Sequence, residues 1–148
     1  MGSRAEQGEL APDFTLPADH RASVALKGLR GRKVVVYFYP KADTPGCTTE
    51  AMDFSRLKPE FEANGTFVAG VSADPVKAQE KFKAKYGLVI PLASDPGHWT
   101  EKSMYGRKYM GIERSTFLIG RDGRIARVWR KVKVPGHAEE VLAAAKAL

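Results

Sequence analysis

The sequence contains a single cysteine, Cys47, among its 148 residues. One cysteine excludes a disulfide within the chain, so folding does not depend on an oxidising compartment. The chain also has only three histidines, which are scattered, and together these residues lack the spacing of a structural zinc site. We therefore expect neither a bound metal nor a cofactor.

Long hydrophobic runs are missing as well. No apolar stretch approaches the roughly 20 residues that a membrane-spanning helix needs, and residues 1–14 lack the apolar core of a signal peptide. A cytoplasmic protein without membrane contact is the expectation. Repeats, low-complexity tracts and Ser/Gly linkers are absent too, and the length suits one compact domain. We expect a single domain over residues 1–148, with residues 1–8 disordered.

Negative charge is scarce relative to positive charge, and the imbalance is local. The whole chain has 24 Lys and Arg against 17 Asp and Glu, a net charge of +7. Residues 107–133 alone carry nine Lys or Arg against Glu113 and Asp122, which is the same excess. Such a basic face can attract nucleic acid or an acidic protein partner, or it can serve only as a solvated surface. No nucleic-acid motif accompanies the charge, so we expect no nucleic-acid binding.

Strands and helices alternate along the first half of the chain. Residues 33–39 form a continuous β-branched and aromatic run, which is typical of a strand buried on both faces. Residues 48–64 follow as a predicted helix, in which Pro59 predicts a kink or a break near Lys58. Residues 66–72 then resemble a second buried strand.

The second half continues this alternation and ends in a hairpin and a helix. Asp74 and Pro75 are suited to the N-cap and first position of a helix that Gly87 ends after Tyr86. Further elements are expected as a strand at 92–94, a short helix at 99–105, strands at 115–119 and 124–130 joined by a turn at 120–123, and a helix at 138–148. This order predicts an α/β protein with a thioredoxin-like fold, in which helices flank a central mixed β-sheet.

Cys47 stands at the predicted junction between a strand and a helix, after Pro45 and Gly46. A thiolate is far more nucleophilic than a thiol, and an unperturbed cysteine with a pKa of about 8.5 is mostly protonated at neutral pH. Unsatisfied N–H groups and the positive end of the dipole at a helix start favour an anion. A free cysteine is often only a small buried hydrophobe, but this position favours a reactive thiol.

The residue three positions before the cysteine narrows the chemistry. A disulfide oxidoreductase on this fold needs Cys-x-x-Cys, whereas this chain has Thr44-x-x-Cys47. A hydroxyl cannot form a disulfide, but it can donate a hydrogen bond to the thiolate or to an oxygen bound beside it. Dithiol exchange within the chain is therefore excluded.

The segment YFYPKADTPGCTTE, residues 37–50, resembles a known family. Its Pro40-x-x-x-Thr44-x-x-Cys47 pattern fits the P-x-x-x-[T/S]-x-x-C signature of the peroxiredoxins, and the longer segment is similar to their Q-type branch, also called bacterioferritin comigratory protein. The likeness extends to residues 11–14 and 104–119 and so covers nearly the whole chain. It implies a thioredoxin-like peroxiredoxin domain with an N-terminal β-hairpin extension, and a thiol-dependent peroxidase that reduces hydrogen peroxide and organic hydroperoxides.

The resemblance also implies roles for the main residues of the site. Cys47 would attack the terminal peroxide oxygen and become a sulfenic acid, with release of water or an alcohol. Thr44 would hydrogen-bond the thiolate and the peroxide. Arg114 would stabilise the thiolate and the charge on the leaving oxygen. From the residues alone, the alternatives are that Thr44 is only a turn or capping residue and that Arg114 is one more surface charge.

Three further residues complete the predicted site. Pro40 would shape the pocket and shield the sulfur from water, although it also simply ends its strand. The backbone N–H groups at Gly46 and at the cysteine would bind the substrate. Glu50 is either a first-turn acid that suits the helix dipole or a minor pocket residue.

The chain departs from the family at the second, resolving cysteine. Many Q-type members carry it five residues after the first or on the next helix, and these positions are Met52 and Lys83 here. A one-cysteine mechanism follows, in which an external thiol reduces the sulfenic acid. Thioredoxin, glutaredoxin, glutathione or a second copy of the chain could supply it. We expect a monomer, with a dimer as the alternative.

Two rival functions belong to other classes. A cysteine hydrolase needs a histidine near the thiol, and His20, His98 and His137 all lack a recognisable hydrolase context. A non-catalytic binding module would use the thioredoxin fold and the basic face while Cys47 stays inert, because fold alone does not establish chemistry. The combination of Thr44, Cys47 and Arg114 favours the peroxidase over both.

Overall fold

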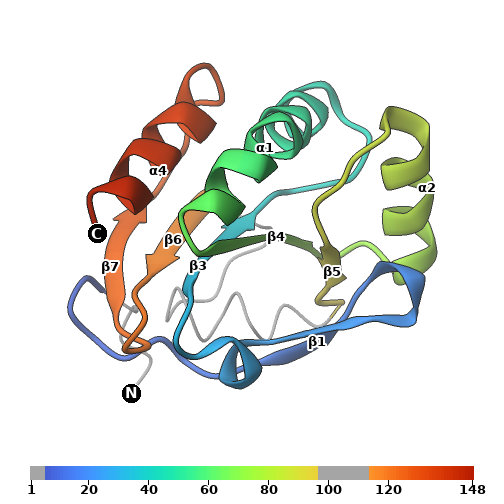
Figure 1. Cartoon of the computed structure of the whole chain (residues 1–148). Helices are drawn as coiled ribbons and strands as arrows, with labels where there is room; N and C mark the ends of the chain where they lie inside the picture. Colours follow the sequence, from blue (N-terminus) through green and yellow to red (C-terminus); the bar gives the residue numbers. More distant parts are fainter. Residues whose placement is uncertain (1–5, 97–113) are drawn as a thin grey trace.

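The computed structural model describes residues 6–96 and 114–148 (Figure 1). Its strands are β1 (Thr15–Pro17), β2 (Ser23–Ala25), β3 (Lys33–Phe38), β4 (Thr66–Ser72), β5 (Leu92–Ser94), β6 (Ser115–Ile119) and β7 (Ile125–Trp129). Its α-helices are α1 (Pro45–Ala63), α2 (Val76–Tyr86) and α4 (His137–Lys146), and short 3₁₀ turns span Asp19–Arg21 and Leu26–Leu29.

The larger sheet is mixed, as the sequence predicts. Its strand order is β5-β4-β3-β6-β7, with β3, β4 and β5 parallel and with β6 and β7 antiparallel to their neighbours. β1 and β2 form a separate antiparallel hairpin near the N-terminus, which confirms the predicted extension. The alternation of strands and helices along the chain therefore produces the thioredoxin-like arrangement.

Strand β3 divides the core into two clusters because successive side chains point to opposite faces of a sheet. Val35, Tyr37 and Tyr39 face the cluster beneath the helices, where Cys47 also lies. Val34 and its alternate neighbours face a second cluster that is covered by the β1–β2 hairpin. Figure 1 shows α1 and α4 together on one side of the sheet and β1 on the other. Every residue of β3 is buried, so the hydrophobic run has the expected role.

Helix α1 begins three residues earlier than predicted. Its predicted start is Thr48, whereas the helix begins at Pro45 with Thr44 as its N-cap. Proline suits the first helical position because its missing N–H has no intrahelical partner there in any case. The prediction was wrong because Pro45 and Gly46 together resemble a turn.

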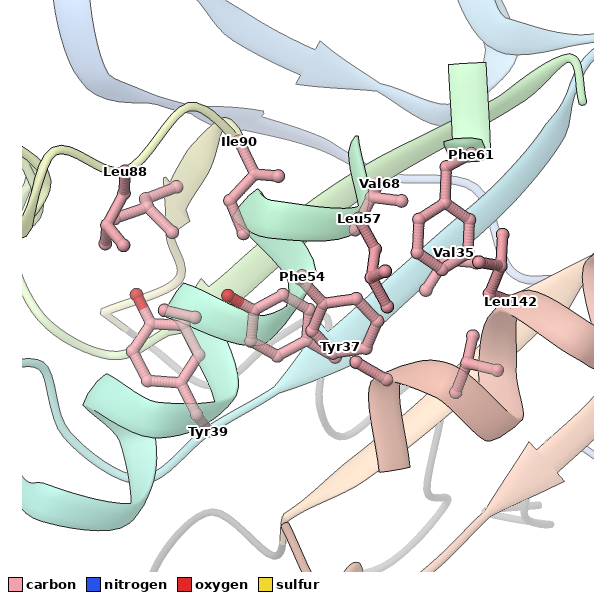
Figure 2. Packing of buried hydrophobic residues seen from close by; sticks show 14 of the residues in the cluster. Val35, Tyr37, Tyr39, Phe54, Leu57, Phe61, Val68, Leu88, Ile90 and Leu142 are labelled. Carbon is pink, nitrogen blue, oxygen red and sulfur yellow. The ribbon is translucent and has the colours of Figure 1, made fainter. Parts of the chain in front are cut away.

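Pro59 does not break helix α1, which continues to Ala63. The proline removes one backbone hydrogen bond, but the helix is anchored on both sides of it. Phe54 and Phe61 are both fully buried against the sheet (Figure 2). Packing of this apolar face outweighs the lost hydrogen bond, so the predicted break is wrong.

Helix α2 begins at Val76 with Pro75 as its N-cap, so the predicted N-cap role of Asp74 is wrong. The Asp74 carboxylate instead accepts the backbone N–H of Ala42 at 2.8 Å and thus holds the segment that precedes α1. Gly87 ends α2 as predicted, in the left-handed conformation with φ of 62°.

The remaining predictions differ only at element ends. The strands at 66–72, 92–94 and 115–119 are confirmed, the first strand ends at Phe38, the strand at 124–130 is shortened to Ile125–Trp129, and the last helix spans His137–Lys146. The short helix predicted at 99–105 lies outside the described residues.

The N-terminal segment is tied to the sheet from Gly8 onward. The Gly8 N–H donates to the carbonyl oxygen of Ile125 at 2.8 Å, and the Gly8 carbonyl accepts from Arg124 at 3.1 Å. Of residues 1–8, which were predicted to be disordered, residues 1–5 lie outside the described part of the chain. Within the described residues, no helix has the length and apolar character needed to cross a membrane.

Candidate active site

Cys47 lies in the first turn of α1, one residue after Gly46. The first intrahelical hydrogen bond runs from the Thr48 N–H to the Thr44 carbonyl at 2.8 Å. The N–H groups of Gly46 and Cys47 precede it and therefore have no intrahelical acceptor. Their partial positive charge adds to that of the helix dipole. The side chain is buried, at 1% exposure, so little water screens this field.

Arg114 contacts the Cys47 sulfur although the two residues are 67 positions apart in the sequence. Its Nη2 donates to Cys47 Sγ at 3.3 Å, and its side chain is only 17% exposed. The register of the sheet explains the contact, because Phe38 at the end of β3 pairs with Ser115 at the start of β6. Arg114 immediately precedes β6, so it lies beside the segment that leads from β3 into α1. The alternative of one more surface charge is therefore wrong for Arg114.

Gly46 permits the close approach of this guanidinium. A Cβ added at Gly46 would lie 3.2 Å from Arg114 Nη2, which is closer than side chains normally tolerate. The glycine thus leaves space for the arginine beside the first turn of the helix. The family resemblance also implies that the Gly46 N–H donates a hydrogen bond to the substrate, and this role stays a prediction.

Glu50 is the second partner of Arg114. Its Oε1 accepts from Arg114 Nη1 at 2.6 Å, and its side chain is 1% exposed. Burial raises the pKa of this carboxyl to about 7, although the nearby Arg114 acts in the opposite direction. Its other oxygen, Oε2, is buried without a hydrogen-bond partner among the described residues. The interpretation of Glu50 as a first-turn acid is wrong, because α1 begins at Pro45 and has no acid in its first turn.

Thr44 and Pro40 contribute less to the observed geometry. The Thr44 hydroxyl donates to the Lys41 carbonyl at 2.8 Å, so here it stabilises the loop before α1. Pro40 is exposed and follows the buried Tyr39 directly. The predicted contacts of Thr44 with a thiolate or peroxide, and the shielding by Pro40, stay predictions.

Aromatic rings pack in the buried cluster that also contains Cys47, and Figure 2 shows Tyr37, Tyr39 and Phe54 of this cluster. The Tyr37 ring stacks on Phe54 with a centroid distance of 4.6 Å, and burial raises the pKa of Tyr37 well above its usual value. The Tyr39 hydroxyl donates to Gln79 on α2, and burial raises its pKa as well. Both phenols are therefore neutral at neutral pH.

His137 packs against Phe54, a member of the buried cluster that contains Cys47. The sequence did not predict this structural role. The His137 Nε2 is 2.8 Å from the Thr116 hydroxyl, and its ring meets Phe54 and Trp129 edge to face. Burial, the main cause, lowers its pKa to about 4, so the imidazole is neutral at neutral pH. The sequence signal was only a histidine at a helix start, and its partner is 21 positions away in the sequence.

The two resolving-cysteine positions have other uses in this chain. Met52 is 48% exposed on α1. Lys83 on α2 donates to the Asp19 carboxylate at 2.8 Å, and that carboxylate also accepts the Leu92 N–H at 2.9 Å. A structural ion pair thus occupies the α2 position.

Most of the described basic residues of the segment 107–133 make hydrogen bonds or ion pairs. Arg121 donates to the Gly31 carbonyl at 2.9 Å, and Arg127 pairs with Glu140 at 3.1 Å. Residues 107–113, with two of the nine basic residues, lie outside the described residues. Among the residues that the structure does describe, no group of three or more His, Cys, Asp or Glu is arranged to hold a metal ion.

The chain has close relatives of one kind. It matches the AhpC/TSA family over residues 7–128. A putative peroxiredoxin Bcp of Coxiella burnetii is 48% identical over 145 residues, which cover 93% of this chain and 96% of that protein. The peroxiredoxin Bcp of Bacillus subtilis is 45% identical over 145 residues, which cover 93% and 92%.

Solved structures agree with these relatives. Xylella fastidiosa PrxQ superposes with a TM-score of 0.91 at 42% identity and covers 98% of both chains. The bacterioferritin comigratory protein of Xanthomonas campestris, studied for its alkyl peroxide reduction activity, has a TM-score of 0.88 at 42% identity over 96% of this chain and 98% of that one. The chain therefore belongs to the AhpC/TSA family, as a thiol-dependent peroxidase of the Bcp peroxiredoxin type that has a single cysteine.

Proposed function

We propose that Cys47 is the peroxidatic cysteine and that Arg114 is its main electrostatic partner. The observation that carries this proposal is the 3.3 Å contact between Arg114 Nη2 and the sulfur of a cysteine in the first turn of a helix. Both side chains are largely removed from water, so the attraction of the guanidinium for a thiolate is poorly screened. Both the arginine and the helix start favour the thiolate, which is the reactive form.

The reaction follows from this geometry. The Cys47 thiolate attacks the terminal peroxide oxygen, and the S–O bond forms as the O–O bond breaks. The bonding pair leaves on the second oxygen, which takes up a proton and departs as water or an alcohol. Arg114 stabilises the charge that moves onto this oxygen. The N–H groups at Gly46 and at the cysteine donate to the substrate, and the Thr44 hydroxyl does so after it turns away from Lys41.

Glu50 acts as a positioning residue for Arg114. The 2.6 Å hydrogen bond fixes the guanidinium with one arm on the carboxyl and the other on the sulfur. Because burial raises the pKa of Glu50 to about 7, the carboxyl is largely neutral in slightly acidic solution. A neutral carboxyl leaves the whole guanidinium charge available to Cys47.

The substrates are hydrogen peroxide and organic hydroperoxides. The Xanthomonas campestris relative, at 42% identity, is described by its alkyl peroxide reduction activity. The buried cluster that contains Cys47 also contains Tyr37, Tyr39 and Phe54, and an apolar surrounding of this kind suits an alkyl group.

The reductant is a thiol that another molecule supplies. The chain has no second cysteine, so the sulfenic acid cannot be resolved within it. Thioredoxin, glutaredoxin and glutathione are the proposed classes of reductant. A monomer in the cytoplasm stays the prediction from the sequence, with a dimer as the alternative.

The experiment measures consumption of hydrogen peroxide and of an organic hydroperoxide with dithiothreitol as reductant. Cys47→Ser should abolish turnover, and Arg114→Lys should slow the reaction with peroxide by about 100-fold, because lysine lacks the fork that holds both partners. Arg127→Lys on β7, which alters an exposed ion pair with Glu140, is the matched control and should retain the wild-type rate. Equal rates for the wild type and Cys47→Ser would overturn the proposal.

A further inference from the structure

A groove with a volume of about 660 Å³ lies between the segment that precedes α1 and helix α2. Residues 41–43 form one wall, and the opposite wall comes from α2 and includes Lys81, Phe82 and Lys85. We call it the lysine groove, because Lys41 completes a set of three lysines around it. Its volume falls within the range of small-molecule sites, about 300–1,000 Å³.

The lysine groove shares two residues with the buried cluster that contains the catalytic cysteine. Ala42 and Phe82 line the groove and also belong to the buried cluster that contains Cys47. The wall at residues 41–43 leads directly into Thr44, whose hydroxyl donates to the Lys41 carbonyl at 2.8 Å. A molecule in the groove therefore contacts the segment that carries the sulfur.

The charges of the groove favour a ligand with two carboxylates. Lys41 and Lys81 are exposed, and neither has a hydrogen-bond or ion-pair partner among the described residues. The acids beside them are already engaged, since Asp43 pairs with Lys85 at 2.9 Å and Asp74 accepts the Ala42 N–H at 2.8 Å. Two ammonium groups thus remain available on opposite walls of the groove.

We propose that the lysine groove binds a small thiol with two carboxylates, of the γ-glutamyl tripeptide type, and that this thiol directly reduces oxidised Cys47. The inference rests on the proposed function and names the class of its reductant. The ligand sulfur attacks the Cys47 sulfenic sulfur, an S–S bond forms, and the S–O bond breaks, so that hydroxide leaves as water with the proton of the thiol. A second molecule attacks the ligand sulfur of this mixed disulfide, which releases the Cys47 thiolate and a soluble disulfide.

Access to the buried sulfur is coupled to the same groove. Asp43 has a φ of 60°, in the left-handed region that few residues other than glycine adopt, and its carboxylate is held by Tyr86 at 2.6 Å and by Lys85 at 2.9 Å. With its two carboxylates on Lys41 and Lys81, the ligand lies against the segment that contains Asp43. Displacement of this segment exposes Cys47 to the bound thiol.

The test compares a charged and an uncharged reductant on enzyme that has been oxidised with one equivalent of peroxide. Glutathione and dithiothreitol are the probes, and the rate constant for recovery of the Cys47 thiol is measured by stopped flow. Lys41→Gln combined with Lys81→Gln should slow glutathione between about 2-fold and about 30-fold, as expected for two solvent-exposed ion pairs. Lys27→Gln combined with Lys146→Gln removes the same charge elsewhere on the surface and should leave the glutathione rate unchanged.

Selective loss of the glutathione rate, with an unchanged dithiothreitol rate and a wild-type glutathione rate that falls with added salt, supports the proposal. An unchanged glutathione rate in the groove variant overturns it, as does an equal loss with both reductants or in the control variant. Wild-type enzyme that is reduced by dithiothreitol or by a protein disulfide reductase, but not by glutathione, also overturns it while leaving the peroxidase assignment intact. Failure of Cys47 to react with peroxide in the first step would instead refute the proposed function.

Discussion

Replacement of Glu50 by glutamine should stabilise the protein progressively as the pH rises. The carboxyl is buried, and its pKa is raised from 4.5 in the reference state to about 7 in the folded protein. Between these values the folded state keeps a proton that the unfolded state has released. Stability therefore falls with increasing pH in this window, because the state that binds more protons is favoured at low pH. Glutamine keeps the shape of the side chain and removes the titration.

The size of the effect follows from the change in pKa. A change of one pKa unit corresponds to about 1.4 kcal/mol, so a change from 4.5 to about 7 amounts to about 3 kcal/mol in the free energy of unfolding. The penalty is absent below about pH 4.5 and complete above about pH 7. The advantage of Glu50→Gln over the wild type should therefore grow by about 3 kcal/mol across this range.

The pH dependence of the wild-type free energy of unfolding would not reveal this effect by itself, because the titration of His137 changes stability with pH in the opposite direction. Burial lowers its pKa from 6.5 to about 4, so the unfolded state binds the extra proton and stability rises with pH between these values. The two windows overlap and the two slopes have similar size. A nearly flat wild-type profile is thus expected around pH 5–6, and only the difference between variant and wild type isolates Glu50.

The assay is urea unfolding followed by tryptophan fluorescence at a series of pH values. Both proteins should carry Cys47→Ser, which removes the titration of the thiol from the comparison. Glu62→Gln, an exposed acid on the same helix, is the matched control and should follow its parent at every pH. Parallel curves for Glu50→Gln and its parent would refute the reasoning, since they would mean that the carboxyl ionises as it does in water.

Two further predictions concern the packing around the site. Gly46→Ala should slow the reaction with peroxide about tenfold without loss of thermal stability, because the new Cβ displaces the Arg114 guanidinium. Gly28→Ala, with open space around its Cβ, is the control. An unchanged rate for Gly46→Ala would contradict the assigned contact. Lys83→Met should lower the free energy of unfolding by roughly 3 kcal/mol, because it removes the ammonium group that pairs with the buried Asp19 carboxylate. Urea unfolding tests this, and a loss equal to that of Lys81→Met would contradict it.

Local sequence patterns predict the framework of this protein well. The β-branched run of β3 and the breaks at Gly87 and at residues 120–123 depend on interactions between near neighbours, which a pattern can capture. The errors occur where distant groups intervene. Pro59 remains in a helix because Phe54 and Phe61 are buried on the sheet, and that burial is not visible in the local sequence.

The site was only partly predictable for the same reason. A cysteine near a helix start indicates a reactive thiol, and Cys47 is confirmed in the first turn of α1. Arg114 could be named only from the family resemblance, because its contact depends on the antiparallel pairing of β6 with β3. The role of Asp74, 32 positions from the N–H that it accepts, had no local signal and was predicted wrongly.

Helix α2 has no resolving cysteine in this chain, so it does not have to move in order to form a disulfide. A disulfide between Cys47 and a cysteine on α2 would require the two sulfurs to approach each other, although the Cys47 side chain is buried. In this chain Lys83 fastens α2 to Asp19, and Gln79 binds both the Tyr39 hydroxyl and the Ala93 carbonyl. These buried contacts favour an α2 that stays in place during turnover. In the segment before α1, the Asp43 carboxylate is held by the exposed Lys85 and the partly buried Tyr86, and the reductant that we propose binds beside this segment.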